Sequence, residues 1–337
     1  MLVRILTVLA LLLTAVESAP AQDFHPVTVM AFNVENLFDT VDDPTNTGDD
    51  TYLPLSFKQS NPDHEANCRA NNDIDFYAEQ CITLDWSEAV LDQKIGALAG
   101  VIAEAAPFPD VLIMPETESP TIVSRLNDAL PANRRYQTLV QLDSTSVTSD
   151  RGIDVAIASR LPLAAPATAH PVDFGDDTEL CRGTRDIIEA SLTLPDGKTL
   201  HVFGVHLPSG GNPFICREHA LQGDLFERAV RFGKWGVPPE VMAGCAEPGT
   251  NKHRERSFGT WFTWSFLDFF LVTENMLAEQ RSMSGWFANL GSFRTVVVSG
   301  EQLEASGEGF VSTKRFDPVA GTGVSDHWPV MIDLLSR

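Results

Sequence analysis

Short apolar runs of the length of a β-strand recur along the whole chain, with few helical patterns between them. Such runs, rich in β-branched and aromatic residues, are typical of strands. Predominantly short strands with three or four helices predict two packed sheets with helices outside, in one domain. The expected strands fall at 27–38, 110–116, 137–142, 150–160, 187–194, 199–207, 264–272, 296–298 and 330–334, and the expected helices at 87–105, 120–130 and 218–230.

Composition limits the classes of function. The 337 residues suffice for one large domain or two ordinary ones, and 43% of them are hydrophobic, enough for a sizeable core. The formal net charge of −22 argues against a protein that binds nucleic acid through a basic surface. It does not argue against an enzyme with a bound cation, because a metal ion supplies local positive charge.

The N-terminal segment has the pattern of a secretory signal peptide. Arg4 precedes a mostly apolar run, and Ala19-Pro20-Ala21 has the small-x-small form of a cleavage site. We therefore expect a signal peptide at 1–21, a single domain at 22–337, and export to the periplasm or the extracellular space. The apolar run is too short for a good membrane span, so no stable membrane insertion is expected. The sequence indicates no protein partner.

Five cysteines in an exported chain allow disulfides. Proximity and similar loop context favour Cys68–Cys81 and Cys181–Cys216, and no zinc-finger spacing occurs. The segment from Asp39 to Ala78 is expected to be a loop. Its acidic pairs would fit a calcium loop, but the spacing of an EF-hand is absent, which favours a solvated acidic surface loop.

Seven polar signals stand at the ends of predicted strands. A carboxylate such as Asp268 inside an apolar run is costly to bury and should have a cationic or imidazole partner. A histidine beside a carboxylate can act as an acid or base near neutral pH. Each signal alone also fits an ordinary role, such as an exposed edge strand, a satisfied core histidine or a polar turn. The signals are Asn33 with Glu35, Glu116, Asp154, Arg185, His206, Asp268 and the pair Asp326-His327.

The order and setting of these residues resemble the endonuclease/exonuclease/phosphatase superfamily, which includes DNase I-like nucleases, sphingomyelinases and inositol-phosphate phosphatases. The resemblance spans Val27 to Leu334 and is strongest to a bacterial exported branch. The motifs that carry it are Phe32-Asn-Val-Glu-Asn-Leu-Phe-Asp39, Asp150-Arg-Gly-Ile-Asp154, Val205-His-Leu-Pro-Ser209, Trp264-Ser-Phe-Leu-Asp268 and Ser325-Asp-His-Trp-Pro329.

The resemblance implies a four-layer α/β sandwich, with two mainly antiparallel sheets flanked by helices, and Mg²⁺- or Mn²⁺-assisted cleavage of a phosphoester. The substrate would be a nucleic acid or a smaller phosphodiester. Hard cations prefer carboxylate and amide oxygens, and phosphoryl transfer needs charge neutralisation and an activated water. By resemblance, Glu116 would be the main metal ligand with Asn33 and Glu35 beside it, and Asp326 would hold or order the metal. His327 would lie at the scissile phosphate, oriented by Asp268. His206 and Arg185 would stabilise the phosphate, and Asp154 and Arg151 would serve the substrate.

One departure keeps a second function open. The superfamily carries a Gly-Asp-x-Asn element after the strand of His206, and this chain lacks it. Gly223-Asp-Leu-Phe226 has Phe in place of Asn, and Gly244-Cys-Ala-Glu247 has Cys in place of Asp. The sequence therefore predicts a metal-dependent phosphoester hydrolase or, alternatively, a catalytically impaired member of the fold that binds metal, phosphate or a partner. A carbohydrate- or calcium-binding β-sandwich rests on the acidic loop alone.

Overall fold

The larger sheet of the molecule has six strands in the order β10-β13-β1-β2-β4-β3. In this computed structural model, the described residues are 24–44, 46–145, 151–177, 180–181, 184–207, 254–255, 262–263, 268, 270, 272–273, 276, 285–305 and 311–336. The parallel pair is β1 with β2, and the other pairings of this sheet are antiparallel. Its strands are β1 (Val27–Ala31), β2 (Val111–Thr117), β3 (Thr138–Gln141), β4 (Asp154–Ser159), β10 (Trp286–Thr295) and β13 (Val330–Ser336).

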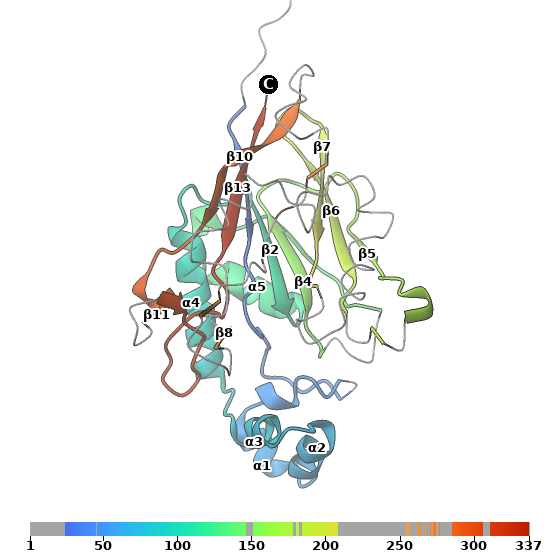
Figure 1. Cartoon of the computed structure of the whole chain (residues 1–337), viewed down its shortest axis with the longest axis vertical. Coiled ribbons are helices and arrows are strands. Elements are labelled where there is room, and N and C mark those ends of the chain that lie inside the picture. Colours follow the sequence, from blue (N-terminus) through green and yellow to red (C-terminus); the bar gives the residue numbers. More distant parts are fainter. Residues whose placement is uncertain are drawn as a thin grey trace, which may run out of the picture.

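A second, antiparallel sheet of three strands packs against the first. Its strands are β5 (Thr168–His170), β6 (Ile187–Thr193) and β7 (Thr199–Gly204), and β6 and β7 form the hairpin expected around Gly197. The two sheets come so close at Gly204 that a Cβ there would lie 2.7 Å from Cγ1 of Val155. Figure 1 shows α4 (Glu88–Glu104), the six-stranded sheet and then β5 to β7 as successive layers.

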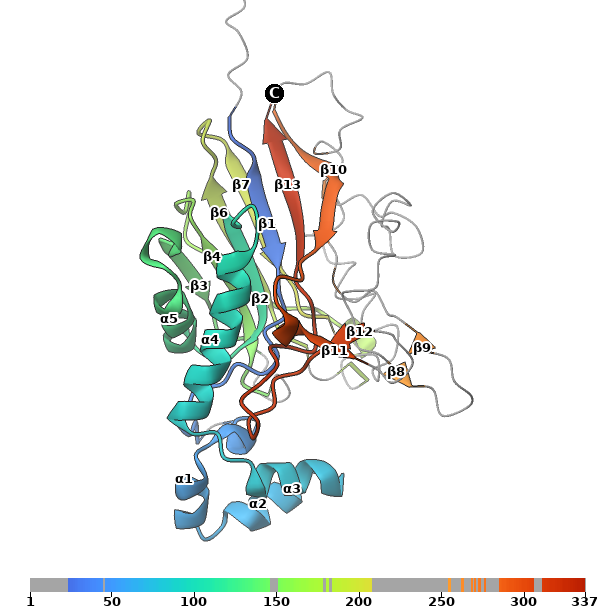
Figure 2. The ribbon, with the colours of Figure 1, turned by 90° about the vertical axis from the view of Figure 1, so that its left-hand side faces the viewer.

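The sequence of β2 explains why this sheet is central. Val111 and Ile113 face the second sheet, whereas Leu112 and Met114 face α4 and α5 (Pro120–Ala129). Neighbouring residues of a strand point to opposite faces, so a strand covered on both faces must be apolar throughout. Figure 2 shows α4 and α5 lying over one face of the larger sheet.

The expected α/β sandwich of two packed, mainly antiparallel sheets with flanking helices is confirmed. The described residues supply three layers, and the helix expected at 218–230 lies outside them, as does most of the strand expected at 264–272. The strand expected at 296–298 is wrong, because these residues follow the end of β10. The remaining short strands are β8 (Arg254–Glu255), β9 (Phe262–Thr263), β11 (Leu303–Ala305) and β12 (Val311–Thr313).

The expected loop from Asp39 to Ala78 is also wrong, because it contains helices. These are α1 (Leu55–Ser60), α2 (His64–Asn71) and α3 (Asp75–Thr83), which lie together below the sheets in Figure 1. They are held by covalent and polar contacts more than by a large apolar face, which is why hydrophobic periodicity did not reveal them. Lys58 is buried, and its Nζ donates at 2.8 Å to the carbonyls of Thr51, Cys81 and Leu84.

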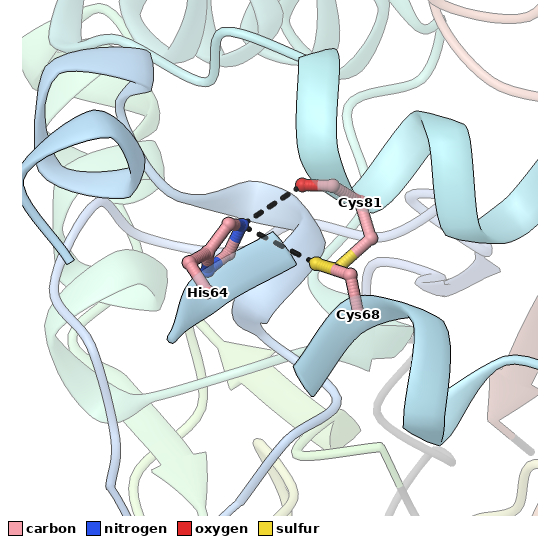
Figure 3. Close-up of side chains that lie close together, drawn as sticks. All are labelled: His64, Cys68 and Cys81. Carbon is pink, nitrogen blue, oxygen red and sulfur yellow. Dashed lines mark hydrogen bonds between the residues drawn. A yellow bond between two sulfur atoms is a disulfide. The ribbon is translucent and has the colours of Figure 1, made fainter. Parts of the chain in front are cut away.

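The expected disulfide Cys68–Cys81 joins α2 to α3 and is confirmed. In Figure 3 the imidazole of His64 lies against it, with Nε2 3.1 Å from the carbonyl oxygen of Cys81 and 3.3 Å from Sγ of Cys68. Since both sulfurs are in the disulfide, this group offers no thiolate to a metal. Cys181 is also disulfide-bonded, but the pairing with Cys216 lies outside the described residues, and so does the expected signal peptide.

Within the described part of the chain, every helix is too short or too polar to cross a bilayer.

Candidate active site at the end of the central strands

The topology brings the predicted polar residues to one end of the larger sheet. Because β1 and β2 are parallel, their C-terminal ends share an edge, and the antiparallel neighbours β13 and β4 begin there. Asn33 follows β1, Glu116 ends β2, Asp154 begins β4, and Asp326 with His327 precedes β13. The residues predicted from strand ends are therefore gathered by the fold itself.

Glu116 is the central carboxylate of this edge. Its Oε1 accepts from Nδ2 of Asn33 at 3.0 Å and lies 3.4 Å from Nε2 of His206, and its Oε2 accepts from the backbone N–H of Asn36 at 2.9 Å. Burial alone would raise its pKa. The neighbouring basic groups His206, Arg151 and His327, with the Asn33 hydrogen bond, instead lower the pKa to about 2. Glu116 is therefore an ionised carboxylate.

The backbone around Glu116 is strained. Among the described residues other than glycine, positive φ occurs at Glu35 (52°), Asn36 (52°), Glu116 (69°) and Arg151 (58°). Side chains with a Cβ rarely adopt this left-handed conformation, and such strain persists where the surroundings impose it. The register of β2 against β4 also shifts between Pro115 and Thr117, which turns the Glu116 side chain out of the strand pattern.

His327 has the carboxylate partner that the setting of Asp268 predicted. Nδ1 of His327 lies 2.8 Å from Oδ2 of Asp268, and Nε2 lies 3.7 Å from Oδ1 of Asp326. Ser325 fixes the segment, because its hydroxyl donates to the carbonyl of Asn33 at 2.7 Å and accepts from the N–H of His327 at 3.1 Å. Burial would lower the pKa of His327, but Asp268, then Asp326 and Glu116, raise it to about 9.

His206 is the second imidazole of the site. It is buried deeply enough that its pKa falls to about 4, although Glu116 opposes this change, and the nearby charges of Arg185, His327 and Arg151 lower the pKa further. Its Nδ1 is buried without a hydrogen-bond partner among the described residues. The site therefore pairs a protonated His327 with a neutral His206 at neutral pH.

Glu35 is joined to Asn33, because the backbone N–H of Glu35 donates to Oδ1 of Asn33 at 2.8 Å. It is 6% exposed and forms an ion pair with Nε of Arg315. Burial raises its pKa, which Lys94 opposes. A cavity of about 50 Å³ is lined by Glu35, Asn36, Lys94 and Arg315, among others.

Sequence reasoning missed Lys94 and Arg315. Lys94 is 1% exposed, donates from Nζ to the carbonyl of Val324 at 2.6 Å, and has a pKa lowered to about 8 by burial, with Glu35 and Asp326 opposing. The sequence does contain a signal for Lys94, because a lysine next to Ile95 lies on the apolar face of the predicted helix. Arg315 comes from a loop without such a pattern.

The three remaining predicted residues lie on the β4 side. Arg151 occupies a turn, and its charge reaches Glu116 and His206. The guanidinium of Arg185 donates from Nε to the carbonyl of Ile153 at 2.9 Å. The carboxylate of Asp154 is buried and accepts from the hydroxyl of Ser144. The charges of Arg151 and Arg185 thus both act on His206, whereas Asp154, at the start of β4, is bound to Ser144.

Among the solved structures similar to this chain, three match it over nearly its whole length. An endonuclease/exonuclease/phosphatase from Beutenbergia cavernae is 15% identical with a TM-score of 0.49, covering 92% of this chain and 72% of its own. SmcL is 13% identical with a TM-score of 0.40, covering 93% and 99%. Beta toxin from Staphylococcus aureus is 13% identical with a TM-score of 0.40, covering 92% and 100%. No family model and no curated protein matches the chain.

The segments 223–226 and 244–247, which the sequence analysis compared with the Gly-Asp-x-Asn element, lie outside the described residues.

Proposed function

We propose that the chain is a metal-dependent phosphoester hydrolase of the endonuclease/exonuclease/phosphatase type. The observation that carries the proposal is the His327–Asp268 pair at 2.8 Å. It is joined through Asp326 and Ser325 to the same sheet edge that holds an ionised Glu116. Hydrolysis of a phosphoester requires a group that transfers a proton and a group that binds a cation. A protonated imidazole can do the first and a carboxylate can do the second.

The residues around Glu116 fit Mg²⁺ or Mn²⁺. Glu116 is ionised, and Asn36, whose N–H contacts it, has a buried Oδ1 without a hydrogen-bond partner among the described residues. Carboxylate and amide oxygens suit these ions, and Mg²⁺ keeps several waters, so few protein ligands suffice. Glu116 would hold the ion with Glu35 and Asp326 nearby. When bound, the cation would neutralise phosphate charge and lower the pKa of a water.

The side chains would divide the remaining work. Asp268 keeps His327 protonated and oriented, so His327 can contact the scissile phosphate and donate a proton to the leaving oxygen. Asn33 and the N–H of Asn36 fix the carboxylate of Glu116. The guanidinium groups of Arg151 and Arg185 supply positive charge for the phosphate oxygens beside a neutral His206.

The proposal extends to the domain at 22–337, export after removal of residues 1–21, and a substrate that is a nucleic acid or a smaller phosphodiester. The test is hydrolysis of bis(4-nitrophenyl) phosphate and of plasmid DNA with Mg²⁺ or Mn²⁺, with and without chelator. We expect chelator-sensitive turnover. Glu116→Gln should abolish it, and His327→Gln should lower kcat by about 10²- to 10⁴-fold.

His25→Gln is the matched control, because His25 is exposed and lies at the opposite end of β1 from Asn33, and it should leave turnover unchanged. Absence of Glu116-dependent turnover on any phosphoester would contradict the hydrolase. The missing Gly-Asp-x-Asn element favours one second candidate, an impaired member of the fold. For that candidate, Mg²⁺ would raise the unfolding temperature in a Glu116-dependent way without turnover.

A further inference from the structure

The acidic segment before α1 is folded into a compact group of carboxylates. Oxygen atoms of Asp42, Asp49 and Asp50 all lie within 4.8 Å of one another. The sequence favoured a solvated acidic loop for this stretch, but Asp49 is only 2% exposed and Asp50 is half-buried. Three carboxylates held this closely repel one another, and either a bound proton or a cation between them relieves the repulsion.

Asp49 is the member that points to a ligand. Its Oδ2 accepts from the backbone N–H of Asp43 at 2.7 Å, and its Oδ1 is buried without a hydrogen-bond partner among the described residues. A buried carboxylate oxygen without a partner is costly, and native proteins rarely leave one so. The pKa of Asp49 is raised to about 7, first by burial and further by Asp50 and Asp42.

The basic side chains near Asp50 already have other partners. His64 and Lys58 both lower the pKa of Asp50, but Nε2 of His64 lies 3.1 Å from the carbonyl oxygen of Cys81, and the ammonium of Lys58 donates to three carbonyl oxygens. Nearby Glu118 supplies no positive charge either, since burial, with Asp39, Asp49 and Asp43, raises the pKa of its carboxyl to about 8. Among the described residues, Asp42, Asp49 and Asp50 form no salt bridge with a lysine or arginine.

We propose that Asp42, Asp49 and Asp50 bind one Ca²⁺ ion, at a site separate from Glu116. Ca²⁺ is favoured over Mg²⁺ because it accepts six to eight oxygen ligands in irregular geometry, as a loop provides, whereas Mg²⁺ requires a near-ideal octahedron. Loop carbonyls and water would complete its coordination. The site does not rest on the proposed hydrolase activity.

The loop that would hold the ion packs against the turn that contains Arg151. A Cβ on Gly48 would lie 2.3 Å from the carbonyl oxygen of Arg151, and one on Gly152 would lie 2.5 Å from Nδ2 of Asn46. On its other side, Tyr52 donates its N–H to the carbonyl of Asp49 at 2.6 Å and stacks on Phe38. Bound Ca²⁺ would therefore order a loop between α1 to α3 and the edge of the active site.

The test is calorimetric titration of CaCl₂ into the metal-stripped full chain carrying Glu116→Gln, which removes the main ligand of the other proposed site. We expect one Ca²⁺ per chain, a higher Tm with Ca²⁺, and no comparable effect of Mg²⁺ at the same concentration. Asp49→Asn added to this background should weaken binding by about tenfold or more. Asp73→Asn is the matched control, since Asp73 is an exposed acid of the same segment, and it should bind as before.

Asp42→Asn guards against misfolding of the Asp49 variant, because Asp42 is partly exposed and its loss does not empty a buried position. It should also weaken Ca²⁺ binding while the far-ultraviolet circular dichroism spectrum stays unchanged. Failure of the Glu116→Gln chain to bind Ca²⁺ at millimolar concentration would overturn the proposal. So would unchanged affinity in Asp42→Asn and Asp49→Asn.

Discussion

At the scale of residues, the pairing of His327 with Asp268 controls the chemistry available to the site. An imidazolium whose pKa is raised to about 9 stays charged through neutral pH and loses its proton as the pH rises through about 9. The carboxylate of Asp268, 2.8 Å away, is the first favourable cause of this shift. The acid form of His327 therefore depends on a partner that is distant in sequence.

Replacing Asp268 tests this dependence. In Asp268→Asn the amide cannot stabilise the imidazolium, so the pKa of His327 should fall and the alkaline limb of the kcat–pH profile should move to lower pH. We also expect kcat to fall by about 10²-fold or more at neutral pH. The profile is measured with bis(4-nitrophenyl) phosphate. An alkaline limb at the same pH as in the unchanged chain would contradict the assigned pairing.

Which residues could be predicted follows from burial and charge. Asn33, Glu116 and Asp268 interrupt apolar runs, and such interruptions are visible in a sequence because they are costly. The ion pair of Glu35 with Arg315 joins segments 280 residues apart, and no local pattern reports it. The left-handed backbone of Glu116 and the group around Asp49 are equally invisible, because they depend on how separate loops meet.

At the scale of elements, the strands and amphipathic helices were predictable where one period dominates. The unbroken apolar run of β2 and the apolar face of α4 are such clear patterns. The strand β10 was not predicted, because Asn289, Ser292 and Arg294 give it the polarity of a sheet edge. Helices α1 to α3 escaped because a disulfide and the buried Lys58 hold them.

Gly204 tests the packing of one element on another. In Gly204→Ala the new Cβ would meet Cγ1 of Val155 at 2.7 Å, so the sheets must separate or Val155 must move. We expect a loss of about 1–3 kcal/mol in the free energy of unfolding, measured by urea denaturation. Because His206 lies two residues further on, kcat should fall as well.

Gly96→Ala is the matched control for this change. Gly96 lies inside α4 with nothing within 4 Å of its Cβ position. The substitution should raise the free energy of unfolding by about 0.5–1 kcal/mol, because alanine favours the helix. Equal effects at the two glycines would contradict the close approach of the sheets at Gly204.

At the scale of the whole molecule, the net charge of −22 acts on any large anionic substrate. The field of the chain repels a polyanion at long range, whereas a small diester feels mainly the local cations of the site. The choice between these substrates should therefore depend on ionic strength.

This dependence can be measured with the proposed hydrolase. Between about 10 and 150 mM NaCl the screening length falls from about 30 to 8 Å. The ratio of kcat/KM for plasmid DNA to kcat/KM for bis(4-nitrophenyl) phosphate should rise over this range. A ratio that falls with added salt would mean that DNA binds through a basic surface, against the acidic balance of the chain.

The contact between Ser325 and Asn33 spans 292 residues, and β1 pairs with β13 along the full length of β1. During translation, the 292 positions that separate Ser325 from Asn33 must thus be synthesised before the two halves of the site can meet. Until then His327 has not been added, and the edge of β1 that β13 will cover remains open. For the proposed hydrolase, the order of synthesis itself keeps the growing chain inactive toward the phosphoesters of the cell that makes it.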